Sequence, residues 1–275
     1  MTFAPTIAAN LAAIERAAVI TARRRADVVL FPECAVTGYG HDFSALRPTE
    51  LRSALAAVGQ IAAACRTHLL VGTPVFRRRR LYNALVHFDR HGRAVYCYAK
   101  CQLTESDRAV FAPGNAVALF EIDGVVATAV ICHERRYPEL VRLAAMAGAQ
   151  ILFHPNAGMD SLAVSRKKRH GRDGIVARAF ENAIYYVFAN SVGPQGGGKW
   201  SAGDTKIVAP NERVLAIADH HNEALLVATL DLTQATRRYP IGSLQHPRFL
   251  ATDWNRMLRS VRRQACKMGQ SFDLP

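Results

Sequence analysis

Two spacings of apolar residues alternate at the start of the chain. Steps of three and four residues between apolar positions predict amphipathic helices over residues 7–24 and 51–65. Short apolar runs rich in β-branched residues predict buried strands over 27–33 and 69–75, each directly after one of these helices. The pattern therefore predicts alternating helices and strands.

Two hairpins are predicted from their turn residues. Asp123-Gly124 is a strong two-residue hairpin signal, because both residue types tolerate the positive φ angles that such turns require. A second turn is predicted around Arg90-His91-Gly92. The strands that these turns join are 83–89 with 94–100, and 117–122 with 125–132.

The rest of the chain continues the alternation of helices and strands. Pro138 suits the first turn of a helix, where its missing N–H would have no partner in any case. Helices are predicted from Pro138 onward and over 173–183, and strands over 150–154, 184–190, 205–210, 214–219 and 225–232.

This order of elements predicts an α/β fold in layers. No internal repeat or low-complexity linker divides the chain. We therefore expect a single domain over residues 1–275, in which 235–275 form an extended basic tail with one short helix.

Composition agrees with a soluble globular protein. The chain has 275 residues, of which 50% are hydrophobic and 21% are charged, which argues against disorder. No run approaches the roughly 20 consecutive apolar residues of a membrane-spanning helix. No secretory signal is apparent, so we expect a cytoplasmic protein with no membrane partner.

The net charge is strongly basic. The chain carries 35 Lys and Arg against 22 Asp and Glu, a formal charge of +13. Nucleic-acid binding is one interpretation of this charge. However, the basic residues are dispersed and no nucleic-acid-binding motif accompanies them. We therefore expect no nucleic-acid partner, and a surface that attracts small anions.

Six cysteines are present, but in a chain of this size without an export signal they predict reduced thiols. Cys97 and Cys101 lie in a predicted strand, where their spacing does not form a zinc knuckle. We therefore expect no metal site.

Three side chains suited to nucleophilic catalysis follow predicted strands. Glu33, Lys100 and Cys132 each come at the end of an apolar run, where α/β proteins place functional groups. A carboxylate can accept the thiol proton, and an ammonium can stabilise a thiolate or the oxyanion of a tetrahedral intermediate. Taken singly, each residue also has an ordinary structural explanation.

The sequence around these three residues resembles the nitrilase, or carbon-nitrogen hydrolase, superfamily. The segments FPECAVTGY (31–39), YAKCQL (98–103) and ICHERRYPEL (131–140) resemble its three signature segments and occur in the same order. The intervening LYNALVHFDRHG (81–92) and VFAPG (110–114), and ARAFENAIYYVFAN (177–190) further along the chain, also match its pattern.

The resemblance implies a fold and a reaction. The fold is a four-layer α-β-β-α sandwich, and the reaction is attack by a cysteine on an amide, carbamoyl or nitrile carbon. Cys132 matches the nucleophile, Glu33 the general base and Lys100 the cation that stabilises the tetrahedral intermediate. No cofactor is implied, and members commonly form homodimers or larger homo-oligomers.

Two features depart from the family pattern. Many members carry a second glutamate before the Phe-x-Pro-Gly element, where this chain has Asp107, with Glu105 two residues earlier. We expect Asp107 to take the role, because LTESDRAVFAPG keeps the length of the family segment. Members also open with a strand that would end near Met1. We expect either a natural start upstream or a degenerate first strand.

Residues beside the nucleophile bear on the substrate. Nitrile-processing members typically carry tryptophan where this chain has His133, which we expect to shape the oxyanion pocket through its backbone N–H. Arg135 and Arg136 match a pair of arginines in carbamoyl amino acid hydrolases and would suit a substrate carboxylate. Arg136 is also common in plain amidases of this family, where it has a structural role.

An amidase is favoured, and a carbamoyl amino acid hydrolase is the first alternative. A nitrilase and a non-catalytic member of the same fold are further alternatives. N-acyl transfer uses the same three residues, but such members are often embedded in a membrane. Tyr39 and Asn156 follow strands and are expected to line the pocket, whereas His154 is expected to be structural.

Overall fold

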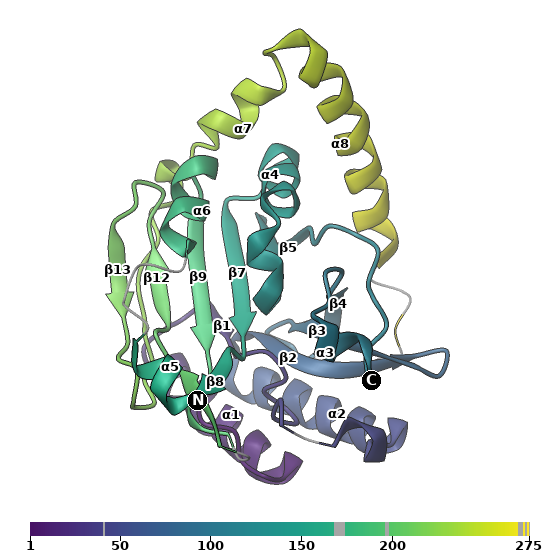
Figure 1. Cartoon of the computed structure of the whole chain (residues 1–275), viewed down its shortest axis with the longest axis vertical. Coiled ribbons are helices and arrows are strands. Elements are labelled where there is room, and N and C mark those ends of the chain that lie inside the picture. Colours follow the sequence, from purple (N-terminus) through teal and green to yellow (C-terminus); the bar gives the residue numbers. More distant parts are fainter. Residues whose placement is uncertain (41, 168–173, 196–197, 269–271, 273, 275) are drawn as a thin grey trace.

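The structure of the chain is a computed structural model that describes residues 1–40, 42–167, 174–195, 198–268, 272 and 274. It contains two large sheets and one small sheet (Figure 1). The strands are β1 Val28–Leu30, β2 His68–Arg77, β3 Arg80–Phe88, β4 Ala94–Ala99, β5 Phe120–Ile122, β6 Val125–Ala129, β7 Ile151–Asn156, β8 Met159–Ser161, β9 Tyr185–Asn190, β10 Val192–Pro194, β11 Lys199–Ala202, β12 Lys206–Val208 and β13 Val214–Ile217.

Helices cover the outer faces of the large sheets. The α-helices are α1 Ile7–Arg23, α2 Pro48–Cys65, α3 Glu105–Arg108, α4 Pro138–Ala147, α5 Leu162–Lys167, α6 Ile175–Asn182, α7 Arg238–Ser243 and α8 Arg248–Met268. Short 3-10 helices are η1 Phe43–Ala45, η2 Cys132–Arg136 and η3 Leu232–Gln234.

The two large sheets have different sizes. One has four strands in the order β1-β2-β3-β4, and the other has six in the order β13-β12-β9-β7-β6-β5. α1 and α2 pack on the four-stranded sheet, and α4 and α6 pack on the six-stranded one (Figure 1). The layers therefore run helix, sheet, sheet, helix, and the predicted α-β-β-α sandwich is confirmed.

Alternating side chains build these layers. In Leu69–Val71 of β2, the outer two residues face α1 and α2, and Leu70 faces the second sheet. In Ile151–Phe153 of β7, Leu152 faces α4 and α6, and its two neighbours pack between the sheets. Successive strand residues point to opposite faces, so strands that are apolar throughout are buried on both sides.

Both predicted hairpins are present. β5 and β6 pair through Asp123 and Gly124, whose φ angles are 48° and 80°. A further hairpin between β2 and β3 turns at Arg78 and Arg79, with φ angles of 48° and 66°. Arginine is not typical of such turns, so no turn residue marks this hairpin in the sequence.

Two predictions at the end of the chain are wrong. Residues 225–232 form no strand, although their sequence is strand-like. The tail is largely helical, because α7 and the 21-residue α8 follow one another, and α8 buries Val261 against Leu143 of α4. Amphipathic packing of α8 on α4 therefore replaces the expected extended tail. The tail residues 269–271, 273 and 275 lie outside the described residues.

The small sheet was not predicted. Its order is β10-β11-β8, and its strands have three or four residues each. Such short strands carry too little pattern to be recognised in the sequence. No helix in the described part of the chain is both long and apolar enough to span a membrane.

Candidate active site

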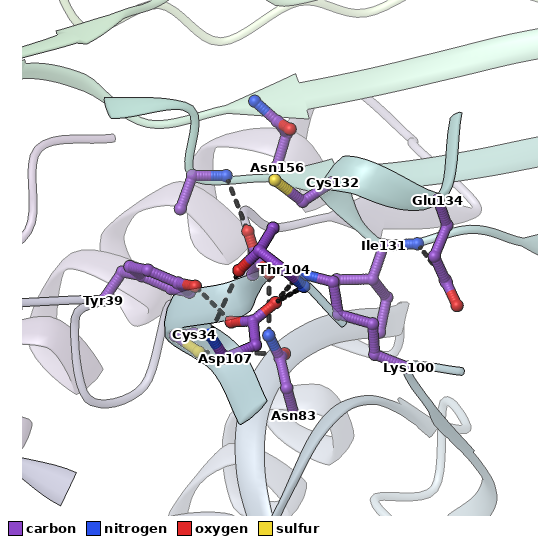
Figure 2. Close-up of polar contacts among 12 residues, drawn as sticks. Cys34, Tyr39, Asn83, Lys100, Thr104, Asp107, Ile131, Cys132, Glu134 and Asn156 are labelled. Carbon is purple, nitrogen blue, oxygen red and sulfur yellow. Dashed lines mark hydrogen bonds and ion pairs between the residues drawn. The ribbon is translucent and has the colours of Figure 1, made fainter. Parts of the chain in front are cut away.

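Three loops at the ends of strands bring Glu33, Lys100 and Cys132 together. Figure 2 shows Lys100 and Cys132 with the residues around them. Glu33 follows β1, Lys100 follows β4 and Cys132 follows β6. The first two strands belong to the four-stranded sheet and the third to the six-stranded sheet. The site therefore exists only where the two sheets meet.

Lys100 lies between two buried carboxylates. Its Nζ is 2.8 Å from Oε1 of Glu33 and 2.8 Å from Oδ2 of Asp107, and all three side chains are fully buried. Burial alone would lower the pKa of Lys100, but Glu33, Cys132 and Asp107 raise it, so the ammonium stays charged. A cation is thus fixed beside the thiol without access to bulk water.

Glu33 sits in a tight turn that a glycine accommodates. The residue after it, Cys34, has a φ of 52°, which reverses the chain directly after β1. Gly72 on β2 faces this turn, and a Cβ built on it would lie 2.2 Å from the Pro32 carbonyl oxygen. Any side chain at Gly72 would therefore displace the backbone that carries Glu33.

Both oxygens of the Glu33 carboxylate are occupied. Oε1 accepts a hydrogen bond from Asn83 Nδ2 at 2.7 Å in addition to the one from Lys100. Oε2 accepts one from the backbone N–H of Ala157 at 3.1 Å. Besides burial, the charge of this carboxylate raises the pKa of the Cys132 thiol, which it faces. These contacts fix the orientation of Glu33 toward the thiol.

Asp107 is held by the start of helix α3. The carboxylate accepts from the backbone N–H of Thr104 at 3.1 Å, and Thr104 Oγ1 accepts from the Asp107 N–H at 3.1 Å. This reciprocal capping box points the carboxylate toward Lys100, and Tyr39 donates its hydroxyl to the other oxygen. Burial alone would raise the pKa of Asp107, but Lys100 lowers it. Glu105, on the same helix, is exposed.

Cys132 occupies a strained position at the start of η2. Its φ is 51°, an uncommon conformation for a residue with a side chain. His154 Nε2 lies 3.0 Å from the Cys132 carbonyl oxygen, and its Nδ1 lies 2.8 Å from the Tyr186 hydroxyl. Because a carbonyl can only accept, Nε2 carries the proton. Burial lowers the pKa of His154 to about 3, so this histidine is a neutral support for the turn, as expected.

The side chain of Cys132 is a neutral thiol in the resting site. Burial and the charge of Glu33 raise the pKa of Cys132 to about 12, although Lys100 acts in the opposite direction. The ammonium therefore does not produce a preformed thiolate. Attack by this sulfur would require a base to accept its proton, and the Glu33 carboxylate faces it.

Glu134 joins the Cys132 loop to the Lys100 loop. Its fully buried carboxylate accepts from the backbone N–H groups of Cys101 at 2.6 Å, Gln102 at 3.1 Å and Ile131 at 2.7 Å. The Tyr98 hydroxyl donates to it at 2.9 Å. Burial raises the pKa of Glu134, against these hydrogen bonds, which lower it.

We expect Glu134→Gln to destabilise the protein by about 2–4 kcal/mol. A glutamine amide keeps one acceptor oxygen but turns an NH₂ group toward N–H donors, so buried donors lose their partner. Urea unfolding monitored by circular dichroism measures the change. Tyr98→Phe removes one of the donors and is expected to cost about 1 kcal/mol. Equal stability of wild type and Glu134→Gln would show that the carboxylate does not hold the two loops.

The other predicted site residues lie around this centre at different depths. His133 is half-buried against the Tyr137 ring, and burial and Arg136 lower its pKa. Asn156 donates its side-chain amide to Asn190 at 2.9 Å, which orders the loop that carries the Ala157 N–H. The Asn156 side chain therefore bonds to Asn190 and supports this loop.

The two arginines differ in exposure. Arg135 is half-buried, and its carbonyl accepts from Arg178 Nε at 3.2 Å, whereas Arg136 is exposed. Within the described residues, no carboxylate lies within ion-pair distance of either guanidinium. Their charges are felt at His133. Burial lowers the pKa of His133 most, and the positive charges of Arg136 and Arg135 lower it further.

Three residues of the site were not assigned from the sequence. Asn83 begins a predicted strand, Ala157 acts through its backbone, and Glu134 lies in the segment ICHERRYPEL but was assigned no role. A polar residue at a position that alternation predicts to be buried, as for Asn83, was the available signal. No group of three His, Cys, Asp or Glu side chains suited to a metal ion occurs in the part of the chain that is described.

Comparisons with known proteins identify relatives of this chain. A family model described as carbon-nitrogen hydrolase matches residues 2–238. The chain is 31% identical to an (R)-stereoselective amidase of a Pseudomonas species over 229 residues, 80% of each protein. It is 28% identical to the 2-oxoglutaramate amidase of Bacillus subtilis over 220 residues, 77% of this chain and 81% of that protein.

Solved structures show the same architecture. The NitN amidase of Nesterenkonia sp. AN1 matches with a TM-score of 0.78 and 25% identity, over 92% of this chain and 96% of that one. A mutant of the Nesterenkonia amidase in complex with butyramide matches with a TM-score of 0.72 and 25% identity, over 80% and 84% of the two chains.

Proposed function

The chain belongs to the carbon-nitrogen hydrolase family, and from this premise we propose that it hydrolyses small non-peptide amides with Cys132 as nucleophile. One observation carries the proposal. A buried ammonium, that of Lys100, and a buried carboxylate, that of Glu33, both face the thiol of Cys132. The amidases among its relatives support amide hydrolysis as the reaction.

The first half of the reaction forms a thioester. Glu33 accepts the proton of Cys132 while the sulfur bonds to the amide carbon, and the carbonyl oxygen becomes an oxyanion beside Lys100 Nζ. Collapse of this intermediate breaks the C–N bond. The proton held by Glu33 passes to the leaving nitrogen, which departs as ammonia or an amine.

The second half returns the enzyme to its resting state. Glu33 removes a proton from water, and the hydroxide adds to the thioester carbon while Lys100 again faces the oxyanion. The C–S bond then breaks, the acid leaves, and the proton returns to the sulfur. Asp107 and Tyr39 orient Lys100 throughout, because the Lys100 ammonium contacts the same carboxylate as the Tyr39 hydroxyl.

A carboxylate-bearing substrate is supported by the two arginines. Arg135 and Arg136 lie three and four residues after Cys132 and have no described carboxylate partner, so they are available to an anionic group of a ligand. ω-Amides of dicarboxylic acids and N-carbamoyl amino acids both combine a scissile C–N bond with a carboxylate. The relative named 2-oxoglutaramate amidase acts on a compound of the first kind.

Ammonia release tests the proposal. The panel contains small aliphatic amides, ω-amides of dicarboxylic acids, N-carbamoyl amino acids and nitriles. We expect turnover of amides, and a higher kcat/KM for ω-amides than for uncharged amides of equal length. Turnover confined to carbamoyl compounds or nitriles would select one of those alternatives. If the folded protein releases no ammonia from any compound of the panel, a non-catalytic member of the family is favoured.

Glu33→Gln is expected to separate thiol ionisation from catalysis. Removing the carboxylate charge lowers the pKa of Cys132 below its wild-type value of about 12, because Glu33 raises that pKa and Lys100 remains to lower it. Amide hydrolysis nevertheless falls about 10³-fold, since no base accepts the proton.

The pH dependence of iodoacetamide alkylation at Cys132, read by peptide mass spectrometry, measures this shift. The apparent pKa moves to lower pH in Glu33→Gln if Glu33 is the base. An unchanged or higher apparent pKa would contradict its contact with the thiol. Cys65, on α2, serves as the internal control, because Glu33 does not contribute to its pKa.

Homo-oligomer formation stays a prediction. Sedimentation of the same samples tests it.

A further inference from the structure

Two asparagines end neighbouring strands of the six-stranded sheet beside the active site. Asn156 ends β7 and Asn190 ends β9, and the two residues are partners in the parallel register of these strands. Both are buried. The chain after Asn156 continues into Ala157 and Gly158, and Ala157 supplies the N–H that bonds to Glu33. The asparagine pair therefore lies at the start of the turn, residues 156–158, that reaches the base of the site.

The side chain of Asn190 makes three hydrogen bonds. Its Oδ1 accepts from Asn156 Nδ2 at 2.9 Å and from the Gly158 N–H at 3.1 Å. Its Nδ2 donates to the Gly203 carbonyl at 2.7 Å. A carboxylate in this place could accept both bonds but could not donate to Gly203. Asn190 thus ties both ends of the 156–158 turn to one anchor.

The anchor, between β11 and β12, is itself held on several sides. The Gly203 N–H donates to the Ser191 carbonyl at 3.1 Å. Gly203 has a φ of 64°, and a Cβ built on it would lie 2.6 Å from the Asp219 carbonyl oxygen. The next residue, Asp204, is buried and pairs with Lys206 at 2.7 Å. Asn190 therefore connects the 156–158 turn to a backbone that has little freedom to move.

The Ala157 N–H faces the base and the nucleophile together. It donates to Glu33 Oε2 at 3.1 Å. Burial raises the pKa of Cys132, and the Ala157 N–H is one of the groups that lower it. A donor in this place favours a thiolate over a thiol.

The contacts of Glu33 indicate which of its oxygens is open to a proton. Oε1 accepts from Asn83 Nδ2 at 2.7 Å and from Lys100 Nζ at 2.8 Å, which uses both of its acceptor positions. Among the residues that the structure describes, Oε2 accepts a backbone hydrogen bond from Ala157 alone, so one acceptor position stays open. The open position is therefore on the oxygen that the Ala157 N–H contacts.

We propose that Asn190 is a positioning residue of this site: through the 156–158 turn it holds the Ala157 N–H at Glu33 Oε2, the atom that receives the proton of Cys132. The inference rests on the proposed function, in which Glu33 is the base. In this step the S–H bond breaks and an Oε2–H bond forms, while the Ala157 N–H keeps its own proton beside the developing thiolate. Asn190 thus affects proton transfer without touching the reacting atoms.

Asn190→Ala and Asn182→Ala are a matched pair of variants that tests the proposal. Asn182, at the end of α6, is also fully buried, and its amide donates to the Arg178 carbonyl at 3.0 Å, outside the 156–158 turn. Both variants lose the hydrogen bonds of a buried amide, so both should lose stability. Only Asn190→Ala should lower kcat for ammonia release, by about 10–100-fold, with KM changed less than about threefold.

Alkylation of Cys132 by iodoacetamide adds a measurement that needs no turnover. At a fixed pH its rate follows the fraction of thiolate. Displacing the Ala157 N–H in Asn190→Ala should therefore slow alkylation of Cys132 at least about threefold relative to Cys65 in the same sample. Asn182→Ala should leave this ratio unchanged, because a purely structural loss does not act on the thiolate.

Gly158→Ala is a second variant that keeps Asn190 in place. A Cβ at Gly158 would lie 2.8 Å from Asn156 Nδ2, so it pushes this amide away from Asn190. We expect kcat and the alkylation ratio to fall as in Asn190→Ala, but by smaller factors. This variant keeps the test decisive if Asn190→Ala does not fold.

Three results would overturn the proposal. One is an unchanged kcat and alkylation ratio in folded Asn190→Ala, and another is faster alkylation of Cys132 in that variant. The third is an equal loss of kcat in Asn190→Ala and Asn182→Ala at equal loss of stability, which would show a structural role alone. If the wild type releases no ammonia, the proposed function fails instead, and slower alkylation of Cys132 in Asn190→Ala would still support the role of Asn190.

Discussion

Cys132→Ala is expected to lower kcat/KM for ammonia release by at least about 10⁴-fold. In the proposed mechanism the sulfur forms the covalent intermediate, and no other described side chain at the centre can replace it. The nearby carboxylate of Glu33 is held by Lys100, Asn83 and the Ala157 N–H, so it cannot itself reach an amide carbon as nucleophile.

Stability should change little in this variant. Alanine keeps the Cβ and the backbone of the strained turn, and the ion pairs of Lys100 do not depend on the sulfur. Thermal unfolding of Cys132→Ala should therefore resemble that of wild type. Cys65→Ala, on the outer helix α2, is the matched control and should keep full activity. Retained turnover in Cys132→Ala would refute a thiol mechanism.

Lys100→Met is expected to have the second largest effect, because it affects both catalysis and stability. Loss of the cation beside the oxyanion should reduce kcat by about 10²–10³-fold or more. It also leaves Glu33 and Asp107, which each lie 2.8 Å from Nζ in the native site, as buried carboxylates without a counter-charge. Breaking such a buried cluster typically costs about 3–5 kcal/mol.

The stability loss in Lys100→Met should depend on pH in a defined direction. Burial raises the pKa of Asp107 and Lys100 lowers it below the ordinary value in the native protein. Without Lys100, burial is no longer offset by the cation, and the folded-state pKa of Asp107 rises above its unfolded value. Protonation then favours the folded variant, so the deficit is largest at neutral pH and shrinks as pH falls toward about 4.

Urea unfolding of wild type and Lys100→Met at several pH values measures this dependence. Lys206→Met is the matched control, because Lys206 is also fully buried and pairs with a carboxylate, Asp204, at 2.7 Å. It should lose stability without a comparable loss of kcat. If the stability that Lys100→Met loses relative to wild type does not change with pH, the variant does not contain unpaired buried carboxylates.

The sequence determined the class of the fold and the candidate residues of the site. Apolar spacing located α1, α2 and most strands, because burial on one or both faces imposes a period on the residues. Glu33, Lys100 and Cys132 stood at strand ends within three recognisable segments, and Asp107 was favoured over Glu105 by its distance from Pro113. These features are local, and local features can be seen in a single sequence.

Only the tertiary structure decided what surrounds these residues. Glu134 ties two loops through backbone N–H groups, and Ala157 contributes an N–H from a third loop. The pKa of Cys132 follows from burial between charges on different sheets.

The same applies to residues 225–232, which have the composition of a strand but pair with no backbone that the structure describes. A strand, a buried charge and an oriented carboxylate each depend on partners distant in the chain. Hydrogen bonds and Coulomb interactions depend on distance in space, and folding alone sets that distance.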